Sequence, residues 1–214
     1  MAVMSESPVS QAPVTESRAT ASSARNQPPA GRYRINPEHS TVTFATRHLF
    51  GLAPVRGTLA LRDGTVNVAD PVTGSTVQAR VGASTFRSGN PVRDAAVLSA
   101  RLLNAGTYPA LTFTSTDLLR DSDGESVGEP DGESGPWLLR GELEARGVTR
   151  LVEARIDGVT VDPGGASFRA SARISVDRYA FGITGFRGLA ARRLTIDLSI
   201  VAERVAAQAR AGQR

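Results

Sequence analysis

Residues 167–177 read Ser-Phe-Arg-Ala-Ser-Ala-Arg-Ile-Ser-Val-Asp, with an apolar side chain at every second position. Phe168, Ile174 and Val176 share one face of this stretch with two alanines, while serines, arginines and an aspartate occupy the other face. Successive side chains of a β-strand point to opposite faces, so a period of two is typical of a half-buried strand. The stretch therefore predicts a strand with one face on a core and one face in water.

The same alternation recurs along most of the chain. It is found at residues 40–48, 55–68, 76–84, 111–117, 137–145, 151–161 and 193–201. With residues 167–177, these segments predict about eight strands at short spacing, without the crossover helices that a βαβ fold requires. The predicted class is all-β, with the strands arranged as an antiparallel up-and-down barrel.

One segment interrupts the strand pattern. From Asn90 to Asn104 the sequence offers Asn90 as a helix N-cap, Pro91 at the first helical position, and apolar residues at helical spacing. We expect one short helix, lying across one end of the barrel.

The ends of the chain differ in composition from the strand-rich part. Residues 1–31 are rich in Ser, Ala, Thr, Pro and Gln and predict a disordered polar tail, residues 32–204 predict the barrel domain, and residues 205–214 predict a C-terminal tail. No stretch has the length or hydropathy of a signal peptide or a transmembrane helix. We therefore expect a cytoplasmic protein without stable membrane insertion.

One predicted loop contains six closely spaced acidic residues. Residues 119–136 are rich in Gly and Ser and contain Asp121, Asp123, Glu125, Glu129, Asp131 and Glu133. These carboxylates lack the spacing and the closing glutamate of an EF-hand calcium loop. They predict a solvated hairpin loop, and we expect no metal site.

Composition excludes several kinds of chemistry. The chain has no cysteine, and all 25 basic residues are arginine, so thiolate nucleophiles, iron–sulfur clusters, Schiff-base lysines and a P-loop lysine are absent. His39 and His48 are the only histidines, and no Gly-x-Ser-x-Gly string joins a predicted strand to a predicted helix, since the one match, Gly124–Gly128, falls in the acidic loop; this argues against a serine hydrolase. The arginines are scattered and only 5% of residues are aromatic, so we expect no nucleic-acid partner and no cofactor.

Several short strings occur in an order that resembles one family. They are His39-Ser-Thr-Val-Thr-Phe44 with Arg47-His48-Leu49, Val55-Arg56-Gly57, Ser88-Gly-Asn90 with Arg93-Asp94, Tyr108-Pro109, Thr112-Phe113-Thr-Ser-Thr116, Gly141-Glu-Leu-Glu-Ala-Arg-Gly147 with Val148-Thr149-Arg150, and Phe181-Gly182. Over residues 33–204 the chain resembles the YceI-like family of lipocalin-shaped, polyisoprenoid-binding proteins. The resemblance implies a lipocalin-like barrel with an internal tunnel, which in the family holds long prenyl chains such as those of quinones or prenyl phosphates.

The sequence departs from the family pattern in the predicted helix. Where the family usually has a histidine and an arginine before a Phe-Phe pair, this chain has Ala96 and Leu98, followed by Leu102 and Leu103. Two polar side chains and two aromatic ones are therefore replaced by aliphatic ones. This shifts the expected ligand toward a long apolar molecule other than the standard prenyl lipid.

Parity along the strands and the Gly-rich segment 179–188 give the candidate site residues. The ligand-binding candidates are Phe44, His48, Val81, Phe113, Trp137, Leu139, Phe168, Ala170, Phe181 and Phe186. Small barrels fill their interior with such side chains, so each of them is equally compatible with a solid core. His48, Thr114 and Tyr179 are the candidates for a polar group that meets a ligand.

Two functions remain open. In the first, the protein is a carrier that shields a polyisoprenoid or polyketide-like chain from water; burial of each methylene is worth about 0.8 kcal/mol, so few polar contacts are needed. In the second, it is a cofactor-independent cyclase that folds a polyunsaturated polyketide or terpenoid for a [4+2] cycloaddition, with a polar candidate polarising a carbonyl. We prefer the carrier function. Whether the protein is an enzyme and whether it forms a homodimer are left open.

Overall fold

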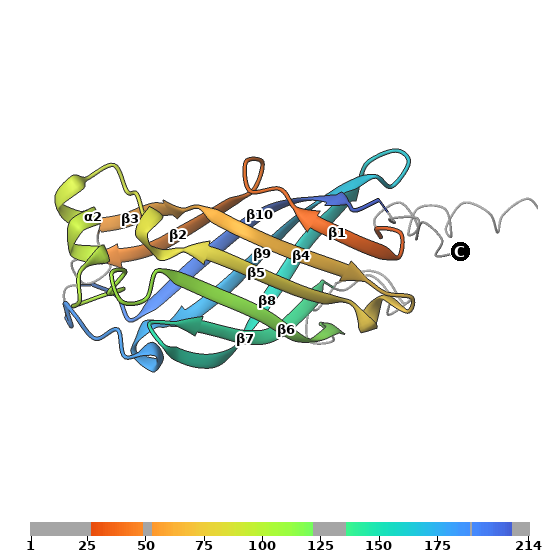
Figure 1. Ribbon diagram of the computed structural model, residues 1–214. Helices are drawn as coiled ribbons and strands as arrows, with labels where there is room; N and C mark the ends of the chain where they lie inside the picture. The colour runs from red at the N-terminus through yellow and green to blue at the C-terminus, as the bar shows by residue number, and fades with distance from the viewer. Residues whose placement is uncertain (1–26, 49–52, 122–135, 189, 207–214) are drawn as a thin grey trace, which may run out of the picture.

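The computed structural model describes residues 27–48, 53–121, 136–188 and 190–206 (Figure 1). Its strands are β1 (Gly31–Ile35), β2 (Thr41–His48), β3 (Ala53–Leu59), β4 (Leu61–Val68), β5 (Thr76–Gly82), β6 (Ala110–Arg120), β7 (Trp137–Ala145), β8 (Val148–Val161), β9 (Ser167–Asp177) and β10 (Arg193–Arg204). One α-helix, α2 (Pro91–Leu98), and three short 3-10 helices, η1 (Val72–Gly74), η2 (Ala83–Thr85) and η3 (Arg178–Phe181), complete the described elements.

The strands form a closed antiparallel barrel. Around the ring, β1 is followed by β4, β5, β6, β7, β8, β9 and β10, and β10 pairs with β1 again. Apart from the β1–β4 and β10–β1 pairings, neighbours around this ring are consecutive strands in the chain, as expected of an up-and-down meander. The predicted all-β barrel of eight strands with one short helix is confirmed.

Two positions in the ring are each filled by two strands. β1 pairs with residues 202–204 of β10, and β2 pairs with residues 195–199 of the same strand, so β1 and β2 follow one another along one edge. β3 and β4 are related in the same way, since β3 pairs with β2 and β4 pairs with β1. The sequence predicted residues 55–68 as one strand, but the Ala60 N–H donates to Thr85 Oγ1 (2.8 Å), which interrupts the strand there.

Three irregularities shift the alternation of inward and outward side chains. The register slips between Leu61 and Asp63, between Ser115 and Asp117, and between Ile156 and Gly158. After the second slip Leu118 is buried although its parity is opposite to that of Phe113. β-Bulges of this kind bend and twist a strand, which helps a small barrel to close.

The two ends of the barrel are built differently. At the helix end (left in Figure 1) lie residues 83–109 with α2, the turn at residues 146–147, and residues 178–192. The opposite end, called the terminus end here, holds residues 69–75 and 162–166 and both ends of the described chain. As expected, Asn90 caps α2, since its Oδ1 accepts from the Arg93 N–H (3.0 Å). Residues 122–135 of the predicted acidic loop lie outside the described residues.

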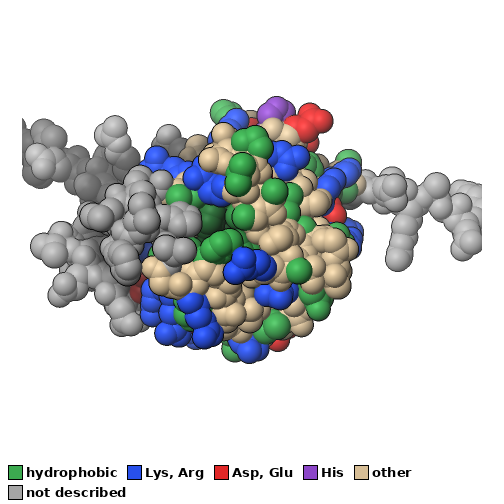
Figure 2. All heavy atoms as spheres, turned by 90° about the vertical axis from the view of Figure 1, so that its left-hand side faces the viewer, with side chains coloured by type: hydrophobic (Ala, Val, Ile, Leu, Met, Phe, Trp, Pro, Cys, Tyr) green, Lys and Arg blue, Asp and Glu red, His purple; other side chains and the backbone are tan. Residues whose placement is uncertain are grey.

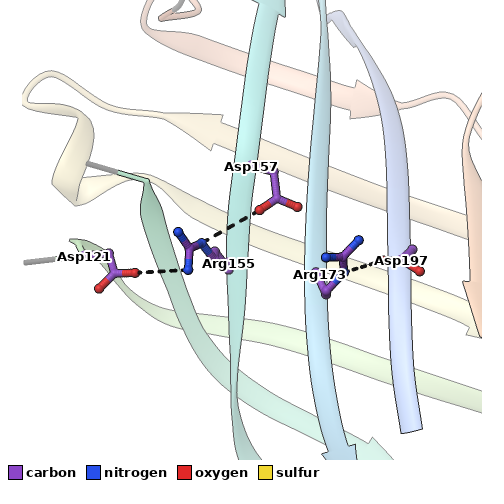
Figure 3. Close-up of polar contacts among 5 residues, drawn as sticks. All are labelled: Asp121, Arg155, Asp157, Arg173 and Asp197. Atoms are coloured by element: carbon purple, nitrogen blue, oxygen red, sulfur yellow. Dashed lines mark hydrogen bonds and ion pairs between the residues drawn. The ribbon is translucent and has the colours of Figure 1, made fainter. Parts of the chain in front are cut away.

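The outer wall carries charges that are paired across strands. Arg155 of β8 lies directly opposite Arg173 of β9, an arrangement that is unfavourable for like charges. Figure 3 shows how carboxylates compensate it: Asp197 accepts from Arg173 Nε (2.7 Å), and Asp121 and Asp157 lie 3.9 and 3.8 Å from the Arg155 guanidinium. The hydrogen bond to Asp197 raises the pKa of Arg173 above its ordinary value. These contacts stabilise the wall and leave the interior apolar.

Candidate ligand-binding cavity

The barrel interior is hollow in its terminus half. A cavity of about 520 Å³, called the terminus-end cavity, is bounded by inward side chains of all ten strands and by residues before β1. Trp137 and Phe168 lie at its outer part, and Gln27 and Pro28 border it there. The guanidinium of Arg120 lies 3.8 Å from the centre of the Trp137 ring and covers it by a cation–π contact.

A second cavity occupies the helix half. This helix-end cavity, of about 730 Å³, lies between α2, the segment 178–191 and the inner faces of β2, β3 and β10. Ala96 and Val97 of α2, together with Leu102 and Leu103 behind it, form its apolar wall. Ala96, Leu102 and Leu103, three of the four aliphatic residues that replace polar and aromatic residues of the family pattern, therefore face this cavity, and Leu98 does not.

The two cavities are neighbours along the barrel axis. Leu59, Leu111, Leu143 and Ile196 border both of them. Each has the size of a pocket for a small organic molecule, and pockets of this size are normally lined by apolar side chains with a few polar groups. A long molecule could extend from one cavity into the other past these four aliphatic side chains.

The structure brings the predicted ligand-binding residues together around this interior. The terminus-end cavity is bordered by Val81, Phe113, Trp137, Leu139, Phe168 and Ala170, and the helix-end cavity by Phe44, Phe181 and Phe186. The backbone of His48 pairs with Ala53 at the end of β2, and its side chain lies outside the described part of the structure. Parity located the residues on strands because the register is fixed by the buried face, whereas Phe181 and Phe186 were found through the Gly-rich segment 179–188.

Two of the three polar candidates do not reach the interior. Thr114 is exposed on the outer wall, because it follows the inward-pointing Phe113 on β6. Tyr179 borders neither cavity and lies next to the guanidinium groups of Arg178, Arg187 and Arg192, at 4.8, 5.0 and 5.4 Å from its ring centre. Neither side chain is placed to hydrogen-bond a molecule inside the barrel.

Other lining residues escaped the sequence analysis for identifiable reasons. Leu118 and Val159 lie after register slips, so the simple alternation assigned them to no face. Phe86 lies between η2 and α2, outside any predicted strand, yet it is 2% exposed and packs edge-to-face on Phe44 with ring centres 5.6 Å apart. The sequence signal that could have identified Phe86 is the presence of a large aromatic residue in a connecting segment.

Arg178 is the only charged residue that is buried in the described part of the chain, at 3% exposed. Its Nε donates to the carbonyl of Ala191 (2.9 Å), Nη1 to those of Ile183 and Gly185 (2.8 and 2.7 Å), and Nη2 to that of Ala190 (3.1 Å). Burial lowers the pKa of Arg178, but an arginine stays charged in proteins. Arg178 thus fixes the segment that borders the helix-end cavity.

Asp177 holds the same segment at its base. Its Oδ1 accepts from the Tyr179 N–H (3.0 Å), and its Oδ2 accepts from Nε and Nη2 of Arg192 (2.9 and 2.5 Å). The hydrogen bond from Arg192 lowers the pKa of Asp177. Both ends of residues 178–192 are therefore tied to one carboxylate at neutral pH.

One hydroxyl in the helix half has no partner. Among the described residues, Thr46 Oγ1 is the buried side-chain oxygen without a hydrogen bond. Thr46 borders the helix-end cavity, which is otherwise lined largely by aliphatic and aromatic side chains. A buried hydroxyl without a hydrogen-bond partner costs free energy, so Thr46 lowers the stability of the folded protein.

A closed antiparallel barrel with a hollow apolar interior defines the class of small-molecule-binding barrels to which lipocalins belong. Residues 33–203 match the YceI-like domain, and the chain belongs to this family. It is 30% identical over 179 residues to Protein YceI of Salmonella arizonae, a match that covers 80% of this chain and 86% of that protein.

Solved structures share the fold at low sequence identity. The crystal structure of BcnA from Burkholderia cenocepacia matches with a TM-score of 0.62 at 18% identity, over 78% of this chain and 98% of that one. A polyisoprenoid binding domain from Saccharophagus degradans matches with a TM-score of 0.61 at 14% identity, over 81% and 98%. Among the described residues, no helix is long and apolar enough to cross a membrane.

Proposed function

We propose that this protein is a carrier that binds a long apolar molecule, a polyisoprenoid or a polyketide-like chain, along the axis of its barrel. The observation that carries the proposal is the pair of neighbouring cavities, of about 520 and 730 Å³, that share four aliphatic lining residues. Burial of each methylene contributes about 0.8 kcal/mol, so a long chain gains affinity from length alone. The likeness to a polyisoprenoid binding domain supports the proposal.

The helix-end cavity favours a ligand with a small polar group or none. Ala96, Leu102 and Leu103 give it an aliphatic wall, and Arg178 uses its hydrogen bonds on backbone carbonyls of its own loop. Thr46 contributes a hydroxyl without a partner. A ligand with a single hydroxyl or carbonyl group would fit this cavity better than a ligand with a highly charged head group.

The cyclase hypothesis is less well supported. It requires a donor that reaches a carbonyl of the substrate, and Thr114 and Tyr179 lie away from both cavities. Of the three polar candidates from the sequence only His48, whose side chain is outside the described residues, is left for that role, and the Thr46 hydroxyl is a further donor at the helix-end cavity. The carrier requires no such donor, so the observations favour it.

Native mass spectrometry of freshly purified protein, followed by extraction into organic solvent, tests the proposal directly. We expect an apolar molecule of chain-like composition to be recovered with the folded protein. The matched experiment uses Ala170→Phe, which places a ring into the terminus-end cavity, and Ser171→Phe as a control on the same strand, since Ser171 is exposed on the outer face. Equal ligand recovery from wild type and Ala170→Phe would contradict an internal site.

Two further expectations remain predictions. Size-exclusion chromatography with light scattering would test the homodimer, and fractionation of the source cells would test the cytoplasmic location. Recovery of the ligand in chemically unchanged form after incubation with the protein would favour the carrier over the cyclase.

A further inference from the structure

The fold gathers arginines at the helix end. The connections there, residues 83–109, 146–147 and 178–192, contain seven arginines, namely Arg87, Arg93, Arg101, Arg146, Arg178, Arg187 and Arg192, against one aspartate, Asp94, and Asp177 directly before the last connection adds a second. The resulting excess of five positive charges exceeds the net charge of +4 of the whole chain. The positive charge of this protein is therefore concentrated on one end of the barrel.

The terminus end has the opposite character. Its described connecting residues, 69–75, 121, 136 and 162–166, contain three aspartates, Asp70, Asp121 and Asp162, and no arginine. The connections at the two ends thus differ in charge, although Arg120 and Arg204, at the ends of β6 and β10, place positive charge near the terminus end as well. A difference in charge between two ends orients a protein at a charged surface over distances of about 10 Å at moderate salt.

Several of the helix-end arginines are available to a partner. Arg87, Arg101 and Arg187 are exposed, and none of them forms an ion pair with a carboxylate of the described residues. Arg101 and Arg187 instead lie over the rings of Phe186 and Tyr179, at 4.9 and 5.0 Å. Phe186 borders the helix-end cavity, so Arg101 lies beside the lining of that cavity.

Apolar surface accompanies this charge. Val92, in the first turn of α2, is 81% exposed and borders the helix-end cavity. Figure 2 looks onto this end and shows apolar side chains within a hollow, with arginines around the part that is visible. An exposed aliphatic side chain beside a cavity mouth, surrounded by arginines, is the pattern of a surface that rests in the headgroup region of an anionic bilayer.

We infer that the helix end docks on the surface of a bilayer containing anionic lipids, so that the apolar ligand passes between the bilayer and the helix-end cavity. This inference rests on the proposed carrier function. A long apolar ligand is stored in membranes, and direct contact between mouth and bilayer spares it from crossing water. A soluble anion would use the arginines but would give the exposed Val92 and the apolar mouth no role.

Flotation with vesicles tests the docking surface. Wild type is mixed with vesicles of phosphatidylcholine alone or with phosphatidylglycerol, at low and high salt. We expect binding only with phosphatidylglycerol, weakened by salt. Each cation near an anionic surface contributes a factor of about five to binding, so replacing Arg87, Arg101 and Arg187 by Gln should weaken binding at least tenfold.

A matched control carries the same change in charge elsewhere. Arg34, Arg80 and Arg169 are exposed residues of β1, β5 and β9 on the barrel wall, and their replacement by Gln should change binding much less. Val92→Asp tests the apolar contact independently and should also weaken binding to anionic vesicles. Binding of farnesol, followed through the emission of Trp137, the only tryptophan, reports in both triple variants that barrel and cavity are intact.

Three results would overturn the docking surface. These are equal loss of binding in both triple variants, equal binding of wild type to neutral and anionic vesicles, or binding to double-stranded DNA as tight as to anionic vesicles. The last would mark the helix end as a nucleic-acid surface. Normal flotation without farnesol binding would instead overturn the carrier function and support the docking surface.

Discussion

Replacement of Arg178 by Met should destabilise the barrel at its helix end. The guanidinium makes four hydrogen bonds to backbone carbonyls, at 2.7 to 3.1 Å, from a position that is 3% exposed. Hydrogen bonds from a charged donor are worth about 1.5–3 kcal/mol each, and burial of the charge costs several kcal/mol in return. The net loss on truncation should be about 3–5 kcal/mol of unfolding free energy, or about 6–20 °C in Tm for a chain of this size.

Two variants separate the fixed geometry from the charge. Arg178→Lys keeps the charge but cannot reach four carbonyls with one ammonium group, so it should be at least as unstable as Arg178→Met. Arg146 also donates to two carbonyls of this end, those of Gly182 and Ala100 (3.1 and 2.9 Å), but Arg146 is only partly buried and these hydrogen bonds are exposed to solvent. Arg146→Met should therefore cost less than about 1.5 kcal/mol.

Urea denaturation gives the free energies, and limited trypsin digestion reports on the loop itself. Trypsin can cleave after the exposed Arg187, and cleavage there should become faster when Arg178 no longer fixes residues 183–191. An Arg178→Met variant as stable as wild type, with unchanged cleavage after Arg187, would refute the role given to this side chain.

Three further predictions concern single contacts. Gly141→Ala should cost about 1–3 kcal/mol, because a Cβ there would lie 2.5 Å from Phe113 Cζ and 2.6 Å from the Thr114 carbonyl oxygen; Gly158→Ala, with its nearest atom at 3.6 Å, is the control, and equal urea midpoints would contradict the steric argument. Thr46→Val should raise stability by about 1 kcal/mol in the ligand-free protein, since it removes a buried hydroxyl without a partner; a lower Tm would show that the hydroxyl is satisfied. Asp177→Asn should lower stability at pH 7, because the depressed pKa of Asp177 contributes stability that is complete above its ordinary value of 3.8 and is lost as the pH falls through the folded-state pKa; a difference from wild type that persists at pH 2 would exclude the carboxylate as its cause.

Much of the cavity lining could be predicted from the sequence because it depends on local alternation. A strand with one buried face has a fixed register, and residues such as Phe113 and Ala170 then point inward by parity alone. The prediction failed to place Leu118 and Val159, because each lies beyond a register slip that depends on pairing with the neighbouring strand. It also placed Thr114 and Tyr179 among the candidates for contact with a ligand, and the structure puts both away from the cavities.

The sequence by itself determined the class, most of the strands and the short capped helix, since periodicity, capping and turn residues act over a few neighbouring positions. Only the tertiary structure decided what distant residues do together. Arginines that are scattered along the chain meet at the helix end because every second connection of an up-and-down barrel returns to the same end. Arg178 binds four carbonyls of its own loop only after that loop has closed over the cavity. Long-range closure brings such groups together, and no local pattern encodes it.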